Sequence, residues 1–288
     1  MNKIGISWAY WVDEWDADPV PYLSRAKRLG FDILEVGSGI ILGMDSDQRA
    51  AFRTECESLD IDVKLCVGLS PDLDVASEDI DVREVGIDYL KQTIEAMAET
   101  GIDTLGGVVY GVWQGGFPAD RPLDIRPFVD RSIASLTEVM KTAEENDVVL
   151  CVEPVNRFEQ FMMTTAEEGV AYCERVGSPN LKILLDTFHQ NIEEDSIAGS
   201  ILTAGARLHH LHLGEPNRRP PGRGRFPWDE FCDALKQIDF QGTLTMEPFV
   251  RSVGGVGRAI GVYRDLTDGL DLDEEAKRSL EFMREKLA

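Results

Sequence analysis

The sequence predicts an α/β protein that folds as a single (β/α)8 barrel, the TIM-barrel architecture. Short apolar runs of strand type alternate with longer amphipathic stretches, and they do so eight times along 288 residues. Eight such repeats favour a parallel sheet that closes on itself. No proline-rich or low-complexity linker divides the chain, so residues 1–288 are expected to form one domain. The alternative is a doubly wound sheet with an appended domain.

The strand pattern recurs in eight segments. They cover residues 3–10, 32–38, 62–69, 104–111, 148–155, 181–187, 208–214 and 242–249. The amphipathic segments between them include residues 21–30, 47–59, 89–101, 135–146, 166–177 and 228–237. Several of these end in Gly or Asn directly before the next strand, as helix C-termini often do.

The composition excludes several kinds of partner. With 52 acidic and 29 basic side chains, the formal net charge is −23, which repels nucleic-acid phosphates and anionic membranes. We interpret most of this acidity as a solvated surface. No run of apolar residues is long enough for a membrane helix, and residues 1–11 lack a signal-peptide pattern. The five cysteines are scattered singly, so we expect reduced thiols and a cytoplasmic protein.

The last four predicted strands end in the same way. Each apolar run finishes on one side chain able to bind a metal or transfer a proton, and these are Glu153, Asp186, His212 and Glu247. A single carboxylate at a strand end is more often a helix cap. Four in consecutive strands point instead to one shared site, because the C-terminal ends of barrel strands converge. Three carboxylates and one imidazole suit an octahedral Mn²⁺, Mg²⁺ or Co²⁺ with two positions left open.

Strand alternation sorts the other histidines of "LHHLHLG". His210 lies on the same side as His212 and one layer deeper, where it supports the site or the core. His209 is expected to face the helix layer. The fourth histidine, His189, follows Asp186 by three residues and should lie at the same mouth.

Further polar residues follow the ligand strands. Glu159 lies six residues after Glu153, and Arg218 lies six after His212. We expect Arg218 to contact the substrate. The other arginines of that loop, Arg219, Arg223 and Arg225, are interpreted as solvated.

Two further motifs resemble ligand-binding sequences, but each has a simpler structural interpretation. "GGVGRAIG" (254–261) imitates a dinucleotide-binding loop, but it follows the eighth strand and has the wrong glycine spacing, so we predict an ordinary loop. The aromatic cluster "WAYWVDEW" (8–15) follows the first strand and is predicted to wall a small pocket.

With these residues in place, the sequence resembles the ketose 3-epimerases, the D-tagatose and D-allulose (D-psicose) 3-epimerase group of the xylose-isomerase-like barrels. The resemblance covers essentially the whole chain. Its most specific parts are "CVEPVNRFE", "LLDTFHQNIEED", "HLHLGEPNRRPPGRGRFPW" and "TMEPFVRSVGGVGRAIGVYRDL".

The resemblance implies one divalent metal, with Mn²⁺ first and Co²⁺ or Mg²⁺ as alternatives. The implied ligands are Glu153, Asp186, His212 and Glu247, of which Glu153 and Glu247 form the acid-base pair. The implied contacts to a free ketohexose or L-ribulose are Glu159, His189 and Arg218, with Trp113 lining the pocket. A homodimer or homotetramer is implied as well.

Two positions depart from the family pattern. Ser7 stands where relatives usually carry Tyr or Phe, and Gln190 follows His189 where Met is common. Ser7 removes bulk from the expected wall around the far end of the sugar, which affects substrate preference rather than chemistry.

Epimerisation at C3 explains why two carboxylates are needed. A proton leaves the carbon next to the C2 carbonyl and returns to the opposite face of a planar enediolate, and one base cannot easily reach both faces. Glu153 and Glu247 are separated by two strands and could flank the sugar.

Other functions remain alternatives. The nearest is an aldose-ketose or hydroxypyruvate-type isomerase on the same barrel. A metal-dependent nuclease for abasic DNA shares the fold but requires a basic groove, against which the charge argues. A sugar phosphate would suit the arginine-rich loop, and an inactive sugar-binding barrel would be expected to lack one of the two glutamates.

Overall fold

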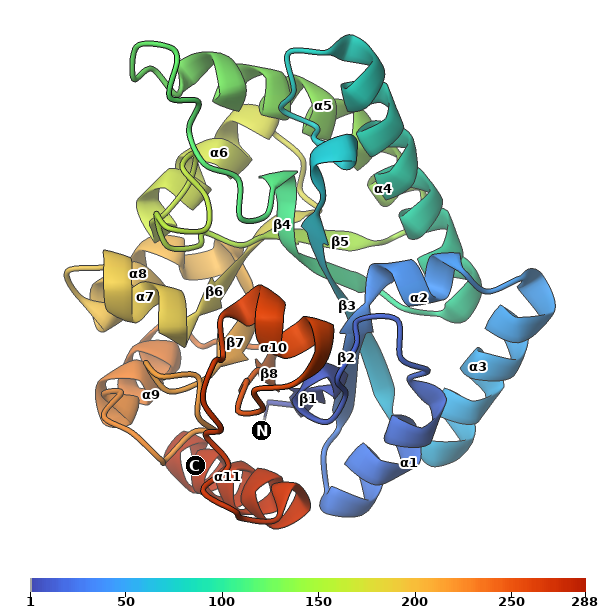
Figure 1. Cartoon of the computed structure of the whole chain (residues 1–288), viewed down its shortest axis with the longest axis vertical. Helices are drawn as coiled ribbons and strands as arrows, with labels where there is room; N and C mark the ends of the chain where they lie inside the picture. The colour runs from blue at the N-terminus through green and yellow to red at the C-terminus, as the bar shows by residue number, and fades with distance from the viewer. Residues whose placement is uncertain (1) are drawn as a thin grey trace.

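Residues 2–288 are described by the computed structural model, and within them eight parallel strands form a closed barrel in sequence order (Figure 1). Each strand pairs with the next, and β1 closes the barrel by pairing with β8. The strands are β1 (Ile4–Ser7), β2 (Ile33–Gly37), β3 (Asp62–Leu69), β4 (Thr104–Val112), β5 (Val149–Val152), β6 (Leu181–Asp186), β7 (Leu208–Leu213) and β8 (Thr243–Met246). The predicted barrel and all eight strand positions are confirmed, with most strands shorter than expected.

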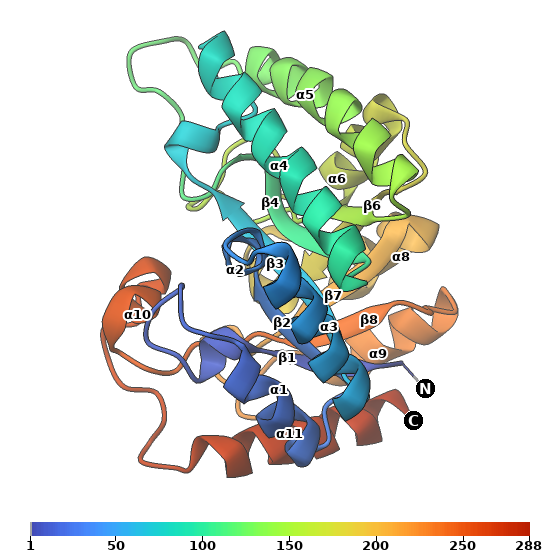
Figure 2. The same cartoon turned by 90° about the vertical axis from the view of Figure 1, so that its right-hand side faces the viewer.

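Helices surround the barrel on all sides. They are α1 (Val20–Leu29), α2 (Ser38–Leu42), α3 (Ser46–Leu59), α4 (Ile80–Thr100), α5 (Arg126–Glu145), α6 (Ala166–Val176), α7 (Thr187–Glu193), α8 (Ile197–Ala204), α9 (Trp228–Gln237), α10 (Gly254–Ile260) and α11 (Leu272–Leu287). The last helix, α11, packs against both α1 and α9 and so completes the outer ring. Figure 2 shows α10 at the end of the barrel opposite the chain's C-terminus.

The helix boundaries follow local sequence signals. Asp45 and Thr165 each begin a helix with a capping box, in which the side chain and the residue three positions later satisfy free backbone N–H groups. Gly30, Gly101 and Gly177 end helices in the left-handed conformation, which glycine adopts without a Cβ clash. These glycines are among the predicted helix ends.

The prediction of an ordinary loop over residues 254–261 is wrong, because most of it forms α10. Its glycines disfavour a helix locally, but tertiary contacts compensate. Gly254 has φ +65°, and a Cβ there would lie 2.1 Å from the carbonyl oxygen of Asp13. The N–H of Val256 donates to that same oxygen. The glycines therefore let α10 dock closely on the segment after β1.

The barrel interior is filled by side chains of matched size. A Cβ at Gly106 on β4 would lie 2.6 Å from Cδ1 of Leu184 on β6, so the missing side chain makes room for the leucine. None of the helices in residues 2–288 combines the length and apolar character needed to cross a membrane.

Candidate active site

The four side chains predicted to share a site lie at the C-terminal mouth of the barrel. Glu153 and Glu247 directly follow β5 and β8, while Asp186 ends β6 and His212 lies next to the end of β7. Asp186 and His212 are partners in the sheet register. The residues that the sequence predicted to share a site are therefore brought together.

The distances within this cluster suit one small cation. Nδ1 of His212 lies 3.5 Å from Oε1 of Glu153 and 3.7 Å from Oε1 of Glu247. Glu153, Asp186 and His212 each offer a ligand atom within 4.8 Å of the others. Neither ring nitrogen of His212 has a hydrogen-bond partner within the described residues, although the side chain is fully buried. A buried imidazole nitrogen grouped with carboxylate oxygens is a donor set that suits a divalent metal.

The charges at the mouth also favour a bound cation. Burial raises the pKa of the Glu247 carboxyl to about 8, and the negative charges of Asp186 and Glu153 act in the same direction, against His212 and Arg218. Burial acts to lower the pKa of His212, but the surrounding carboxylates outweigh it and raise that pKa well above its ordinary value. The cluster thus holds more negative charge than its own side chains balance, and the residues present fit a metal ion.

His189 presents one defined ring nitrogen to the mouth. Its Nδ1 accepts from the backbone N–H of Asn156 at 3.2 Å and lies 2.8 Å from the Asn156 amide nitrogen. The proton is therefore on Nε2, which lies 3.9 Å from Glu153 and 4.0 Å from Asp186. Burial lowers the pKa of His189 despite the nearby Asp186 carboxylate. A neutral imidazole that donates from Nε2 suits a sugar oxygen.

Glu159 is held from two sides. Its Oε1 accepts from the Asn156 amide at 2.9 Å, and its Oε2 accepts from the indole N–H of Trp113 at 2.9 Å. Asn156 was missed by the sequence analysis, although it lies in the motif "CVEPVNRFE". Its position between Glu159 and His189 could have been found only from their spatial proximity.

Arg218 reaches the cluster from the loop after β7. Its Nη1 lies 2.9 Å from Asp186 and 3.2 Å from Glu247, and its guanidinium stacks 3.9 Å above the ring of Phe188. Its φ of +63° is unusual for a non-glycine residue and costs about 1 kcal/mol. The loop that holds it is organised by buried Glu215, which accepts from Gly222 N–H and the Trp228 indole. Glu215 was also missed.

The prediction of a solvated role holds only for part of the arginine loop. Arg223 and Arg225 are exposed, as expected, whereas Arg219 is half-buried. Arg219 pairs with Asp268 and Arg223 with Glu275, so both tie the loop to the C-terminal segment. A contact between segments so far apart in sequence leaves no local signal.

The prediction that His209 faces the helix layer is wrong. Leu208 pairs with Ile183 and His210 pairs with Leu184, so His209 is an extra residue in β7. This bulge interrupts the alternation on which the prediction was based. Nε2 of His209 lies 3.5 Å from Oγ1 of Thr104 on β4, a strand that is not a neighbour of β7.

His210 lies deeper than His212 on the same side, as predicted, and contacts a residue that the sequence analysis missed. Its Nε2 lies 2.8 Å from Oε2 of Glu35 on β2. Oε1 of Glu35 lies 2.9 Å from Nε2 of His212. A charged residue inside the apolar strand "ILEVG" was the available signal.

A cavity of about 360 Å³ opens above the cluster. Its wall includes Glu159, His189 and Arg218. Four aromatic side chains, Trp8, Trp15, Trp113 and Phe249, also line it, so the aromatic segment after β1 walls a pocket as predicted. Gly68 leaves room for the Trp113 side chain, because a Cβ at position 68 would lie 2.8 Å from it. Ser7, 4% exposed, lines the same cavity.

Comparison with known proteins agrees with this geometry. The family model described as "Xylose isomerase-like TIM barrel" matches residues 23–286. The D-psicose 3-epimerase of Ruminiclostridium cellulolyticum is 40% identical over 287 residues, which cover 98% of this chain and 97% of that protein. The D-psicose 3-epimerase of Agrobacterium fabrum is 39% identical, with 98% of both chains covered. The chain belongs to the ketose 3-epimerase family.

Solved structures support the same assignment. A D-psicose 3-epimerase crystallised in the presence of D-fructose superposes with a TM-score of 0.95, at 39% identity and 99% coverage of both chains. A second D-psicose 3-epimerase, from Clostridium cellulolyticum H10 and with D-tagatose, superposes with a TM-score of 0.95 at 40% identity, again with 99% of both chains covered. This ketose 3-epimerase family member is thus an enzyme of the isomerase class that acts on carbohydrates.

Proposed function

We propose that this enzyme interconverts free ketohexoses at C3, such as D-fructose with D-allulose and D-tagatose with D-sorbose, and that it also accepts L-ribulose. Relatives named D-psicose 3-epimerase and L-ribulose 3-epimerase support this range of substrates. The cavity of about 360 Å³ is large enough for a six-carbon sugar.

One divalent metal ion, Mn²⁺ before Co²⁺ or Mg²⁺, would be held by Glu153, Asp186, His212 and Glu247. When bound, it would supply Lewis-acid stabilisation of the negative charge that develops on O2 as C3 loses its proton. The unpartnered Nδ1 of His212 and the excess of buried carboxylates support this site.

Glu153 and Glu247 are proposed to transfer the proton. One carboxylate removes it from C3, which leaves a planar enediolate, and the other donates a proton to the opposite face. The two carboxyl groups approach the His212 ring from β5 and from β8.

The remaining residues would hold the sugar. Arg218 and His189 each present an N–H at the cluster and would donate to the oxygens near C2. Glu159, fixed by Trp113, would accept from a hydroxyl near C1. Aromatic residues of the cavity wall, Trp8 and Trp15 among them, would pack against the carbon skeleton of the sugar.

The observation that carries this proposal is the approach of Glu153 and Glu247 to one imidazole at the floor of a sugar-sized cavity. Incubation of the metal-loaded enzyme with D-fructose in D₂O tests it. Deuterium should enter at C3, together with formation of D-allulose. Deuterium at C1 of the ketose without change at C3 would instead indicate an aldose-ketose isomerase.

The metal, the domain organisation and the assembly are tested separately. Initial rates with the stripped enzyme and added Mn²⁺, Co²⁺ or Mg²⁺ should be highest with Mn²⁺.

We further propose that residues 1–288 form one domain and that the enzyme is a homodimer or homotetramer. Phe158 and Tyr263, both more than four-fifths exposed, support an apolar contact between copies. Light scattering after size exclusion would give the number of subunits.

A further inference from the structure

Glu35 is a buried carboxylate in the middle of β2, and its side chain points into the barrel. It is 1% exposed. A buried carboxylate is costly unless it is paired and hydrogen-bonded. Here the partners are two histidines of β7. Nε2 of His210 makes a 2.8 Å hydrogen bond to Oε2, and Nε2 of His212 lies 2.9 Å from Oε1 as an ion pair without hydrogen-bond geometry.

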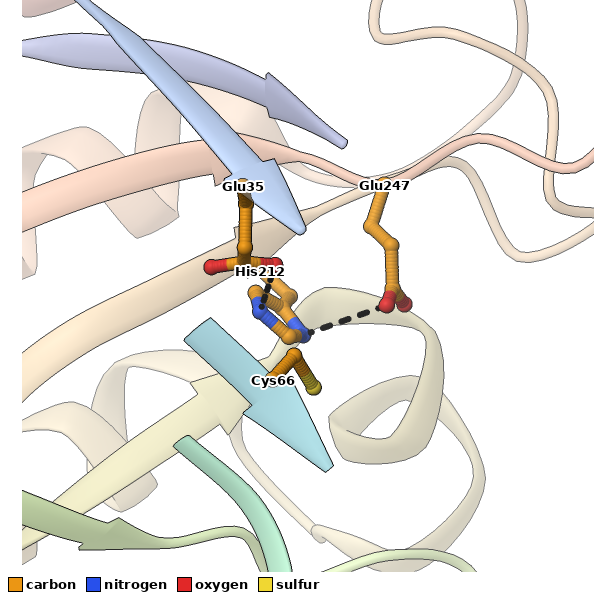
Figure 3. A group of neighbouring side chains, drawn as sticks. All are labelled: Glu35, Cys66, His212 and Glu247. Carbon is orange, nitrogen blue, oxygen red and sulfur yellow. Dashed lines mark ion pairs between the residues drawn. The ribbon is translucent and has the colours of Figure 1, made fainter. Parts of the chain in front are cut away.

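The two ring nitrogens of His212 have different surroundings. Figure 3 shows the ring between Glu35 and Glu247, with one ion pair on each side. Nε2 faces Glu35, whereas Nδ1 faces Glu153 and Glu247. A carboxylate beside Nε2 favours the proton on that nitrogen, which leaves the Nδ1 lone pair directed at the ligand cluster.

Glu35 is itself fixed in place. Because the His210 Nε2 donates to Glu35, its Nδ1 is an acceptor, and it lies 2.7 Å from the hydroxyl of Thr243 on β8. A chain of contacts thus runs from Thr243 through His210 to Glu35 and on to His212. It joins β8, β7 and β2 below the mouth and leaves the carboxylate little freedom to rotate.

We infer that Glu35 is a positioning residue, which fixes the tautomer and ring orientation of His212 so that Nδ1 is ready to bind the catalytic metal. This inference rests on the metal site of the proposed function. Glu35 is not among the residues that line the cavity, and it faces Nε2 of His212 whereas Glu153 faces Nδ1. Replacing a carboxylate that contacts the second ring nitrogen of a metal-binding histidine typically weakens metal binding by about 10-fold to 100-fold.

The test is the Mn²⁺ dissociation constant, measured by titration calorimetry without sugar. Glu35→Gln keeps the shape of the side chain but removes the negative charge that faces both imidazoles. We expect Mn²⁺ binding to weaken by about 10-fold to 100-fold with one ion still bound per chain. The kcat at saturating Mn²⁺ should fall by a smaller factor.

Asp103→Asn is the matched control. It removes the carboxylate that pairs with buried Lys64 at the N-terminal end of the barrel. We expect reduced thermal stability with an unchanged Mn²⁺ dissociation constant. If Glu35→Gln does not fold, Glu35→Asp carries the test, because it keeps the charge but is too short to contact both imidazoles, and we expect binding weakened by at least about 3-fold.

Three outcomes would overturn the inference. Unchanged Mn²⁺ affinity in the Glu35 variants would show that the contact is only structural. Loss of binding by more than about 1,000-fold would make Glu35 a direct ligand, since that exceeds the effect of a supporting carboxylate. A wild-type enzyme that binds no Mn²⁺ would remove both this inference and the proposed metal site, whereas one that binds Mn²⁺ without exchange at C3 would remove the proposed function alone.

Discussion

The indole N–H of Trp113 donates a 2.9 Å hydrogen bond to Oε2 of Glu159. Trp113 follows β4 and Glu159 lies in the loop after β5, so this bond joins two loops at the mouth of the barrel. It also lets one indole both line the cavity and orient a carboxylate within it. Trp113 is therefore more than an apolar wall.

Replacement of Trp113 by Phe tests this double role. The change keeps an aromatic ring but removes the donor, so Glu159 should lose its fixed orientation. We expect KM for D-allulose to rise by about 10-fold, equivalent to about 1.4 kcal/mol, with a smaller change in kcat. Trp11→Phe is the matched control, because the Trp11 indole donates to Asp273 away from the cavity. Equal effects of the two variants on KM would contradict the proposed role.

Glu153→Gln and Glu247→Gln test the two-carboxylate mechanism. Each variant loses one proton-transfer group and one anionic ligand, so we expect turnover to fall by about 10²-fold to 10⁴-fold and Mn²⁺ to bind more weakly. Rates are measured by the formation of D-allulose from D-fructose, and metal content by elemental analysis. Glu167→Gln, an exposed carboxylate on α6, should leave both unchanged. Normal turnover with a full metal site in either glutamine variant would exclude the mechanism.

Ser7 should influence which sugar is preferred. Ser7→Tyr places a ring in the cavity, so we expect kcat/KM to fall for six-carbon ketoses relative to five-carbon ones by about 10-fold, since steric discrimination of this kind contributes 1–3 kcal/mol. Initial rates for D-allulose and L-ribulose give the ratio. Ser7→Ala separates the hydroxyl from the bulk, because it removes only the acceptor for the Ala9 N–H. An unchanged ratio in Ser7→Tyr would show that Ser7 does not limit the sugar's length.

Because of His209, the free energy of unfolding should decrease as the pH falls below 6.5. Burial lowers the pKa of its imidazole to about 4 from 6.5, with nearby positive charge adding to the effect. The folded protein therefore binds fewer protons than the unfolded chain between these values. Stability is retained above pH 6.5 and falls as the pH drops towards 4, by at most about 3 kcal/mol.

Urea unfolding of wild type and His209→Gln at pH 7.5 and pH 5 measures this effect. The difference in free energy of unfolding between the two pH values should be smaller in the variant, because glutamine does not titrate. The same difference in both proteins would show that His209 does not contribute to acid sensitivity.

Metal removal should reduce thermal stability as well as activity. An ion that binds only the folded protein stabilises it by about 2.7 kcal/mol at 100 times its dissociation constant. Dialysis against a chelator should lower Tm by several degrees, and added Mn²⁺ should restore both Tm and epimerisation. A Tm that does not respond to Mn²⁺ would argue against an ion bound by four strands.

The four residues of the ligand cluster could be predicted from the sequence because the barrel is regular. Every strand delivers its last residues to the same mouth, so one position per strand was enough to group Glu153, Asp186, His212 and Glu247. Glu159 and Arg218 followed from their short distance to those strand ends. Only the clustering is established by the fold, and the roles of these residues stay predictions.

Other parts of the site depend on contacts that no local pattern records. Glu35 meets His210 and His212 across the barrel interior, from a strand more than 170 residues earlier in the chain. His209 turned inward because a bulge in β7 interrupted the two-residue alternation. Arg219 and Arg223 are held by partners in the C-terminal segment.

The sequence by itself thus determined the closed barrel and the residues that reach its mouth, because hydrophobic periodicity and strand ends are local properties. The tertiary structure decided which nitrogen of His212 faces Glu153 and Glu247 and which side chains lie behind the ring. Those choices depend on closure of the sheet through β1 and β8, which lets a buried carboxylate of β2 contact the imidazoles of β7 inside the barrel.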